Sequence, residues 1–133
     1  MADLKKIAEL VDQMIADDLD LPQFEFPHRL YAGDDTHATL IGKNDDPYEL
    51  MESVTKPANI EAGVLVACGW ATKASDDGDY NPRNRVRVRI VTSFRDGEIY
   101  TIARMEENPT EVMDMGSSGE GPLNEALNEW WNS

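Results

Sequence analysis

The fold of this chain is decided by residues 85–105, which read RVRVRIVTSFRDGEIYTIARM. Arginines at positions 85, 87 and 89 alternate with apolar residues, and this period of two is typical of a β-strand with two unlike faces. The dipeptide Asp96-Gly97 is typical of a two-residue type I′ turn. Residues 85–94 and 98–105 are therefore predicted to pair as an antiparallel hairpin.

The turn also predicts which residues lie opposite one another in the hairpin. Arg95 is expected to face Glu98, and each further pair keeps the same sum of residue numbers, which places Arg89 opposite Arg104. Like charges directly opposed on a sheet are unfavourable by up to about 1 kcal/mol, so a compensating group is expected nearby. The side chains predicted to face the core are Val88, Ile90 and Phe94.

The N-terminal segment is predicted to be an amphipathic helix. Apolar residues recur at three- and four-residue spacing from Leu4 to Ile15, and Asp3 is a suitable N-cap. The side chains expected on the opposite, solvent-facing side are Lys5, Glu9, Asp12 and Asp17.

Shorter elements are predicted between this helix and the hairpin. Residues 29–32 and 38–41 are candidates for two short strands. Asp46 followed by Pro47 begins a short helix, because the first residue caps and the second suits the first helical position. The apolar run Ala62–Thr72 is predicted to be a central strand of the sheet.

After the hairpin the chain is predicted to run through a loop to a flexible stretch, residues 116–121. A final helix begins at Pro122. Together the elements predict a single α+β domain, residues 1–133, in which an antiparallel β-meander of about three to five strands carries helices packed on one face.

The composition favours some partners over others. The chain has 26 acidic and 12 basic residues, a net charge of −14. Such a field disfavours direct binding to nucleic acid or to an anionic membrane, and it favours a protein partner with a basic surface. The longest apolar run, Gly63–Ala71, is too short to span a bilayer, and the single cysteine, Cys68, fits a reducing compartment. We expect a cytoplasmic protein.

The sequence predicts no catalytic residue, no metal site and no cofactor. Cys68 lies inside an apolar strand, where a thiol is packing rather than a nucleophile. His28 and His37 match no familiar ligand spacing and are expected on the surface. Residues 76–79 lack most ligands of a calcium loop. Residues 116–121 lack the lysine of a phosphate-binding loop, which favours a hinge.

The arginine row is the strongest candidate for a site. Arg85, Arg87, Arg89 and Arg104 are predicted to form a planar basic patch on one face of the sheet. Pairing with the surplus acids of the chain, including the base-free residues 105–133, is the favoured interpretation. The alternative is a binding site for an anionic ligand or an acidic partner, because guanidinium groups suit both.

A second candidate surface is aromatic. Trp130 and Trp131 close the apolar stripe of the last helix and are expected to be exposed near its end. Aromatic side chains surrounded by charge are typical anchors of protein interfaces. The pair is therefore a candidate interface for a protein partner.

The C-terminal half of the chain resembles small uncharacterised acidic proteins of actinobacteria and their phages. The resemblance implies no particular activity, and it makes a phage or actinobacterial origin an expectation. The segments that carry it are Gly69-Trp70, Arg85-Val86-Arg87-Val88 and Gly119-Glu120-Gly121-Pro122-Leu123.

Three functions are compatible with these features. The leading hypothesis is a non-enzymatic protein-binding or regulatory protein, directed at a host protein if the chain is phage-encoded. The second is a DNA mimic that inhibits a nucleic-acid-binding protein by presenting carboxylates in place of phosphates. The third is a binder of an anionic small molecule through Arg85, Arg87, Arg89 and Arg104.

Overall fold

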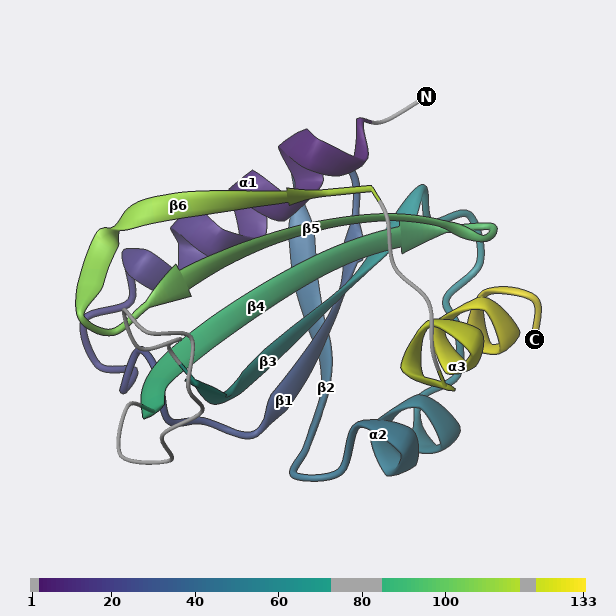
Figure 1. Ribbon diagram of the computed structural model, residues 1–133. Coiled ribbons are helices and arrows are strands. Elements are labelled where there is room, and N and C mark those ends of the chain that lie inside the picture. Colours follow the sequence, from purple (N-terminus) through teal and green to yellow (C-terminus); the bar gives the residue numbers. More distant parts are fainter. Residues whose placement is uncertain (1–2, 73–84, 118–121) are drawn as a thin grey trace.

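The computed structural model describes residues 3–72, 85–117 and 122–133 (Figure 1). The acidic loop at residues 76–79 and most of the glycine-rich stretch, residues 118–121, lie outside the described residues. In chain order the elements are α1 (Leu4–Ala16), β1 (His28–Gly33), β2 (Ala38–Asn44), α2 (Pro47–Ser53), β3 (Ala62–Thr72), β4 (Arg85–Arg95), β5 (Glu98–Met105), β6 (Asn108–Gly116) and α3 (Pro122–Trp131).

Within the described residues, six strands form one antiparallel sheet in the order β2-β1-β3-β4-β5-β6. The five strands predicted from the sequence are all present, and β6 is additional. The sequence predicts a loop there, because Asn108-Pro109 and Gly116 are turn-forming residues. Pro109 is tolerated since β6 is an edge strand, and its pairing with β5 is interrupted by two register shifts.

The predicted hairpin register is confirmed. Arg95 lies opposite Glu98, and Arg89 lies opposite Arg104. Asp96 has a φ of 45° and Gly97 a φ of 83°, so both central residues of the turn have the positive φ that a type I′ turn requires. The local chemistry of two residues therefore sets the alignment of β4 and β5.

Helices cover both faces of the sheet, so the prediction that they pack on one face is wrong. α1 packs on the face that carries Val64 and Val66, whereas α2 and α3 pack on the face that carries Leu30 and Leu65. Figure 1 shows α2 and α3 side by side and away from α1. Because β1 and β3 carry apolar side chains on both faces, helices must pack on each face to bury them.

The cover over the second face is partial. Phe94 is buried and meets the Trp130 ring of α3 edge-on, with 5.7 Å between ring centroids. Val88 is also buried, as predicted, but Ile90 is 38% exposed. The prediction that all three hairpin residues face the core is therefore wrong for Ile90, which is not part of the apolar cluster under α2 and α3.

The predicted helix starts are confirmed. The carboxylate of Asp3 accepts a hydrogen bond from the Lys5 amide at 2.9 Å, and that of Asp46 accepts one from the Tyr48 amide at 2.8 Å. Both satisfy donors that a helix leaves free at its first turn. In the described part of the chain, none of the helices is long and apolar enough to cross a membrane.

Candidate functional site

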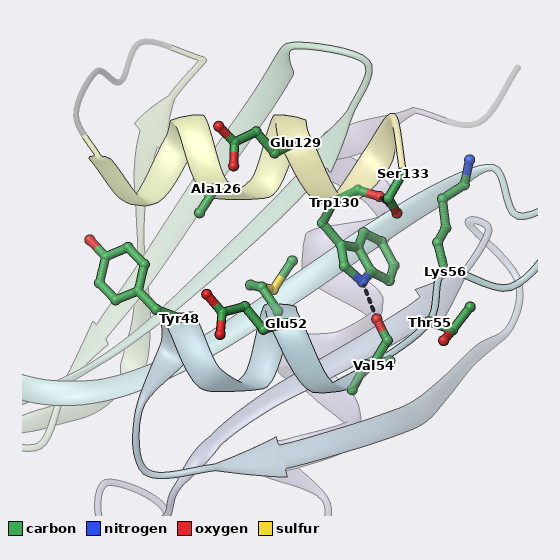
Figure 2. A pocket seen from close by; sticks show the side chains of 10 residues that line it. Tyr48, Glu52, Val54, Thr55, Lys56, Ala126, Glu129, Trp130 and Ser133 are labelled. Carbon is green, nitrogen blue, oxygen red and sulfur yellow. Dashed lines mark hydrogen bonds between the residues drawn. The ribbon is translucent and has the colours of Figure 1, made fainter.

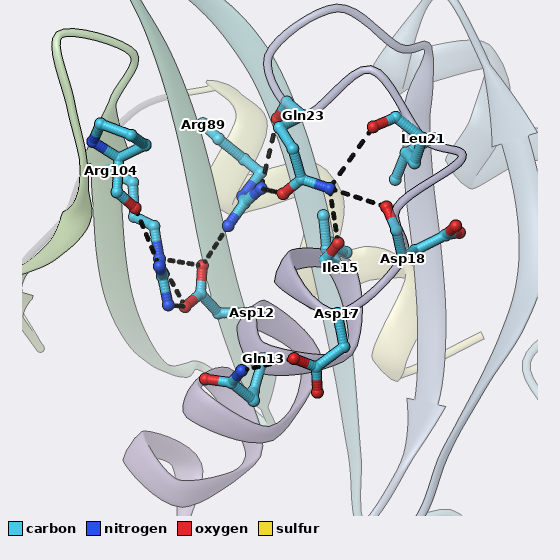
Figure 3. A network of polar contacts seen from close by, with 10 residues as sticks. Asp12, Gln13, Ile15, Asp17, Asp18, Leu21, Gln23, Arg89 and Arg104 are labelled. Carbon is cyan, nitrogen blue, oxygen red and sulfur yellow. Dashed lines mark hydrogen bonds and ion pairs between the residues drawn. The ribbon is translucent and has the colours of Figure 1, made fainter.

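The arginine row is organised around Asp12, an acid of α1 that was predicted to face solvent. Asp12 is buried, with 3% of its surface exposed, and not solvent-facing as predicted. Arg89 donates from Nη2 to Asp12 Oδ1 at 2.9 Å, and Arg104 donates from Nε to Asp12 Oδ2 at 2.9 Å (Figure 3). One carboxylate of α1 therefore binds two guanidinium groups, which are strong, charge-assisted contacts.

Gln23 extends this network to the end of α1. Its Oε1 accepts from Arg89 Nη1 at 2.6 Å, and its backbone carbonyl accepts from the same nitrogen at 3.2 Å. The side-chain amide nitrogen of Gln23, Nε2, donates in turn to the backbone carbonyls of Ile15 at 2.7 Å and Asp18 at 3.1 Å (Figure 3). The last carbonyls of a helix have no partner within it, so Gln23 joins the arginine of β4 to the C-terminal end of α1.

The loop after α1 lies against three arginines of the same face of the sheet, Arg89, Arg29 and Arg87. The Cζ of Arg89 lies 5.5 Å from the centroid of the Phe24 ring, and that of Arg29 lies 5.1 Å from the centroid of the Phe26 ring. Glu25 forms an ion pair with Arg87, with 2.6 Å between Oε1 and Nη2. Arginines of β1 and β4 thus fasten the segment between α1 and β1 to the sheet.

Three members of the row are engaged with groups of the chain, as the favoured interpretation predicts. In the described part of the chain the acids paired with these three arginines come from the N-terminal segment, as Asp12 and Glu25, whereas residues 105–133 were expected to contribute. Arg104 does contact that segment, by donating to the carbonyl of Pro109 at 2.9 Å. A cue was present in the sequence: Asp12 follows Ala8 by four residues and precedes Ile15 by three, which places it beside the buried stripe.

The row does not form one open patch, which corrects the predicted planar basic surface. The exposed fraction of the side chain is 1% for Arg89, 12% for Arg104 and 29% for Arg87. Arg85, at the start of β4, is exposed. The row is buried at one end because α1 and the loop after it cover this face, which sequence alternation alone assigns to solvent.

The open end of the row is aromatic. Trp70 lies opposite Arg87 in the β3–β4 ladder and is 52% exposed. The Cζ of Arg87 lies 4.2 Å from the centroid of its ring, and that of Arg85 lies 5.1 Å from it. A guanidinium over an indole is favourable by about 0.5–1 kcal/mol at an exposed site. We call these three residues the Trp70 surface.

Trp130 and Trp131 do not form the exposed pair that the sequence predicts. Trp130 is buried, and its Nε1 donates to the carbonyl of Val54 at 2.8 Å. Trp131 is half-buried, with the Lys56 ammonium 4.6 Å from its ring centroid. The prediction of exposure is wrong for Trp130, because the apolar stripe of α3 turns into the core.

The described residues show how the cysteine and the two histidines of the chain are placed. Burial raises the pKa of the half-buried Cys68, which keeps the thiol protonated at neutral pH. His28 lies at the start of β1 and His37 beyond its other end, so the two are separated by the strand's length. Within these residues no three His, Cys, Asp or Glu side chains are grouped to hold a metal.

No family model, no curated protein and no solved structure matches this chain. The resemblance to actinobacterial and phage proteins therefore stays a prediction.

Proposed function

We propose that this chain is a non-enzymatic protein-binding domain whose contact surface is the Trp70 surface. The observation that supports the proposal is an indole that is 52% exposed while two guanidinium groups lie 4.2 and 5.1 Å from its centroid. The proposal keeps the leading hypothesis from the sequence and moves its interface from Trp130 and Trp131 to Trp70.

The residue types of this surface suit recognition of a protein. Tryptophan and arginine are enriched among the few residues that dominate the binding energy of interfaces. The Trp70 ring lies on a strand and is flanked by Arg85 and Arg87, while Glu25 fixes Arg87 from the loop. A side chain held in place before binding loses less conformational freedom on association.

The chemistry of the partner is inferred from long-range electrostatic attraction and from the short-range contacts that the Trp70 surface offers. At long range the net charge of −14 favours the approach of a basic protein surface. At contact the exposed indole requires an apolar recess, and the exposed Arg85 offers donors to a carbonyl or carboxylate at the edge of that recess. We therefore propose a partner that is basic overall and that accepts Trp70 in an apolar recess edged by a carbonyl or carboxylate.

The arginine row gives little support to binding of an anionic small molecule. Arg89 and Arg104 share the buried carboxylate of Asp12, and Arg87 is paired with Glu25. An anion at these guanidinium groups would have to displace a carboxylate already bound there. Arg85 alone is left as the exposed member of the row.

The test is comparative capture with matched variants. Wild type, Trp70→Ala and Met115→Ala are immobilised and exposed to the same cell lysate; Met115 is an apolar residue of β6 that is 57% exposed. The proposal predicts partners that wild type and Met115→Ala retain and that Trp70→Ala loses at least about tenfold, the range of an interface hot spot.

Two outcomes would count against this surface. An unchanged partner list for Trp70→Ala would show that Trp70 does not carry the binding. Capture of nucleic-acid-binding proteins that is independent of Trp70 and falls steeply with salt would instead support the DNA-mimic alternative.

A further inference from the structure

Two cations lie directly opposite each other near the β2 edge of the sheet. Arg29 of β1 is opposite Lys43 of β2, and residues opposed in this way carry their side chains on the same face, with Cβ atoms about 4.5–5.5 Å apart. Within the described residues β2 is the last strand on this side of the sheet (Figure 1). Neither residue belongs to the arginine row or to the Trp70 surface.

The sheet contains another opposed pair of cations, and the two pairs differ in their compensation. Arg89 and Arg104 share the buried carboxylate of Asp12. In the described part of the chain neither Arg29 nor Lys43 forms an ion pair with an acid. Because like charges directly opposed on a sheet are unfavourable, the Arg29–Lys43 pair lacks the anion that the Arg89–Arg104 pair has.

The guanidinium group of Arg29 is held by uncharged groups. Its Nη1 donates to the hydroxyl of Tyr31 at 3.3 Å, and its Cζ lies 5.1 Å from the centroid of the Phe26 ring. Its Nε is buried and has no hydrogen-bond partner within the described residues. A charge that is partly removed from water is costly unless an opposite charge or hydrogen bonds compensate it. Arg29 is only half-buried, so an anion can approach the guanidinium from solvent.

Lys43 is free to bind a ligand, unlike two other lysines of the chain. Lys56, beside the groove between α2 and α3, donates to the carbonyl of Trp131 at 3.0 Å (Figure 2). Lys5 forms an ion pair with Asp114. Lys43 is exposed, and its ammonium makes no comparable contact with the described residues.

The charges of Arg29 and Lys43 suit a phosphate group better than a carboxylate. A guanidinium group can bind two oxygens of a phosphate at once, and an ammonium adds a point charge beside them. A phosphate monoester carries close to two negative charges at about pH 7.5. It therefore matches the two cations, whereas a carboxylate carries a single charge.

We propose that Arg29 and Lys43 form a binding site for the phosphate group of a small phosphate monoester. The net charge of −14 opposes the approach of an anion at long range. We therefore expect modest affinity, with a dissociation constant of about 1 mM at low ionic strength. The site lies outside the Trp70 surface, so this proposal does not depend on the proposed function.

The experiment is a titration of the full chain with phenyl phosphate, followed by ¹⁵N–¹H NMR at about pH 7.5 and low ionic strength. Phenyl sulfate is the matched ligand, because it has the same tetrahedral shape and one charge fewer. We expect saturable shifts in residues 28–31 and 41–45 with phenyl phosphate. Binding of phenyl sulfate is expected to be at least about fivefold weaker.

Charge variants assign the site. Lys43→Gln removes an exposed ammonium and is expected to weaken binding of phenyl phosphate about tenfold. Lys6→Gln removes an exposed ammonium from α1 and is expected to leave the dissociation constant within about twofold. Lys43→Glu places a carboxylate opposite Arg29 and is expected to abolish binding.

A stability measurement without ligand tests the missing anion independently. Lys43→Glu supplies an acid to Arg29 within the chain, so its melting temperature is expected to be about 1–3 °C above that of Lys43→Gln. A melting temperature at or below that of Lys43→Gln would show that Arg29 needs no anion.

The titration has three outcomes that overturn the proposal. The first is the absence of saturable shifts in residues 28–31 and 41–45 with phenyl phosphate. The second is equal binding of phenyl sulfate, and the third is binding of phenyl phosphate that Lys43→Gln leaves unchanged.

Discussion

Arg89 and Arg104 lie directly opposite each other on β4 and β5, and both bind the carboxylate of Asp12. The hairpin turn makes this opposition of like charges unavoidable, because the register follows from Asp96-Gly97. The acid that compensates it lies on α1, 77 residues before Arg89 and 92 residues before Arg104. The arginine row is therefore a clamp between the sheet and the N-terminal segment.

Gln23 is predicted to be a structural member of this clamp. Gln23→Ala removes the shorter of the two Gln23 contacts of Arg89 Nη1, the one to Oε1, and the donor to the Ile15 and Asp18 carbonyls. We expect the free energy of unfolding to fall by about 1–3 kcal/mol, since a buried guanidinium loses a charge-assisted hydrogen bond. Urea unfolding measures it.

The control for Gln23 is Gln13→Ala. Gln13 is exposed on α1, and its amide donates to Asp17. Loss of that surface contact is expected to change the free energy of unfolding by no more than about 0.5 kcal/mol. If both substitutions changed the free energy of unfolding equally, Gln23 would contribute no more to stability than an exposed glutamine.

Trp70 is predicted to be the tryptophan that solvent reaches most easily. It is 52% exposed, Trp130 is buried and Trp131 is half-buried. Iodide is an anion, and the guanidinium groups of Arg85 and Arg87 near the ring favour its approach. Trp70→Phe is therefore expected to remove most of the iodide-quenchable fluorescence.

Trp131→Phe is the matched variant for this quenching measurement. It removes an indole that is partly covered by Lys56, so most quenchable emission should remain. If Trp131→Phe, and not Trp70→Phe, abolished the quenchable component, the assignment of Trp70 as the exposed ring would be wrong.

Asp114 is predicted to make stability depend on pH in the acid range. Hydrogen bonds from Tyr100 and from Lys5 hold the pKa of Asp114 below its ordinary value. A carboxyl whose pKa is lower in the folded state stabilises that state above its unfolded pKa, about 3.9. This contribution is lost as the pH falls through the folded-state pKa.

The measurement compares urea unfolding of wild type and Asp114→Asn from pH 7 to pH 2.5. Wild type is expected to be the more stable at pH 7, and the two are expected to converge at the acid end. The other carboxyl groups titrate in both proteins and cancel in the difference. A gap that stayed constant across this range would contradict the role of Asp114.

Local patterns in the sequence predict most helices and strands of this fold, but they do not predict which helices pack on which face of the sheet. The hairpin register and the starts of α1 and α2 depend on neighbours in the chain, such as Asp96-Gly97 and Asp46-Pro47, and they are confirmed. The strand β6 is missed because Pro109 and its exposed neighbours resemble a loop. An edge strand has only one partner and carries a weak apolar pattern.

The candidate site depends on contacts between distant segments, and this limits its prediction. Alternation in β4 assigns the arginine face to solvent, whereas Asp12 supplies the charge that lets α1 cover it. The sequence also cannot decide which indole is covered. Trp130 turns into the core because α3 meets α2 and Phe94, while Trp70 stays exposed at the open end of the arginine row.

The clamp is tested most directly by the free energy of unfolding of Asp12→Asn at pH 7, measured by urea denaturation beside Glu9→Gln. Glu9 is an exposed acid on the same helix, so its substitution is expected to change the free energy by no more than about 0.5 kcal/mol. Asp12→Asn leaves Arg89 buried without its carboxylate, and a loss of about 3–5 kcal/mol is predicted. A loss below about 1 kcal/mol would contradict the clamp and return the arginine row to the candidates for a ligand site.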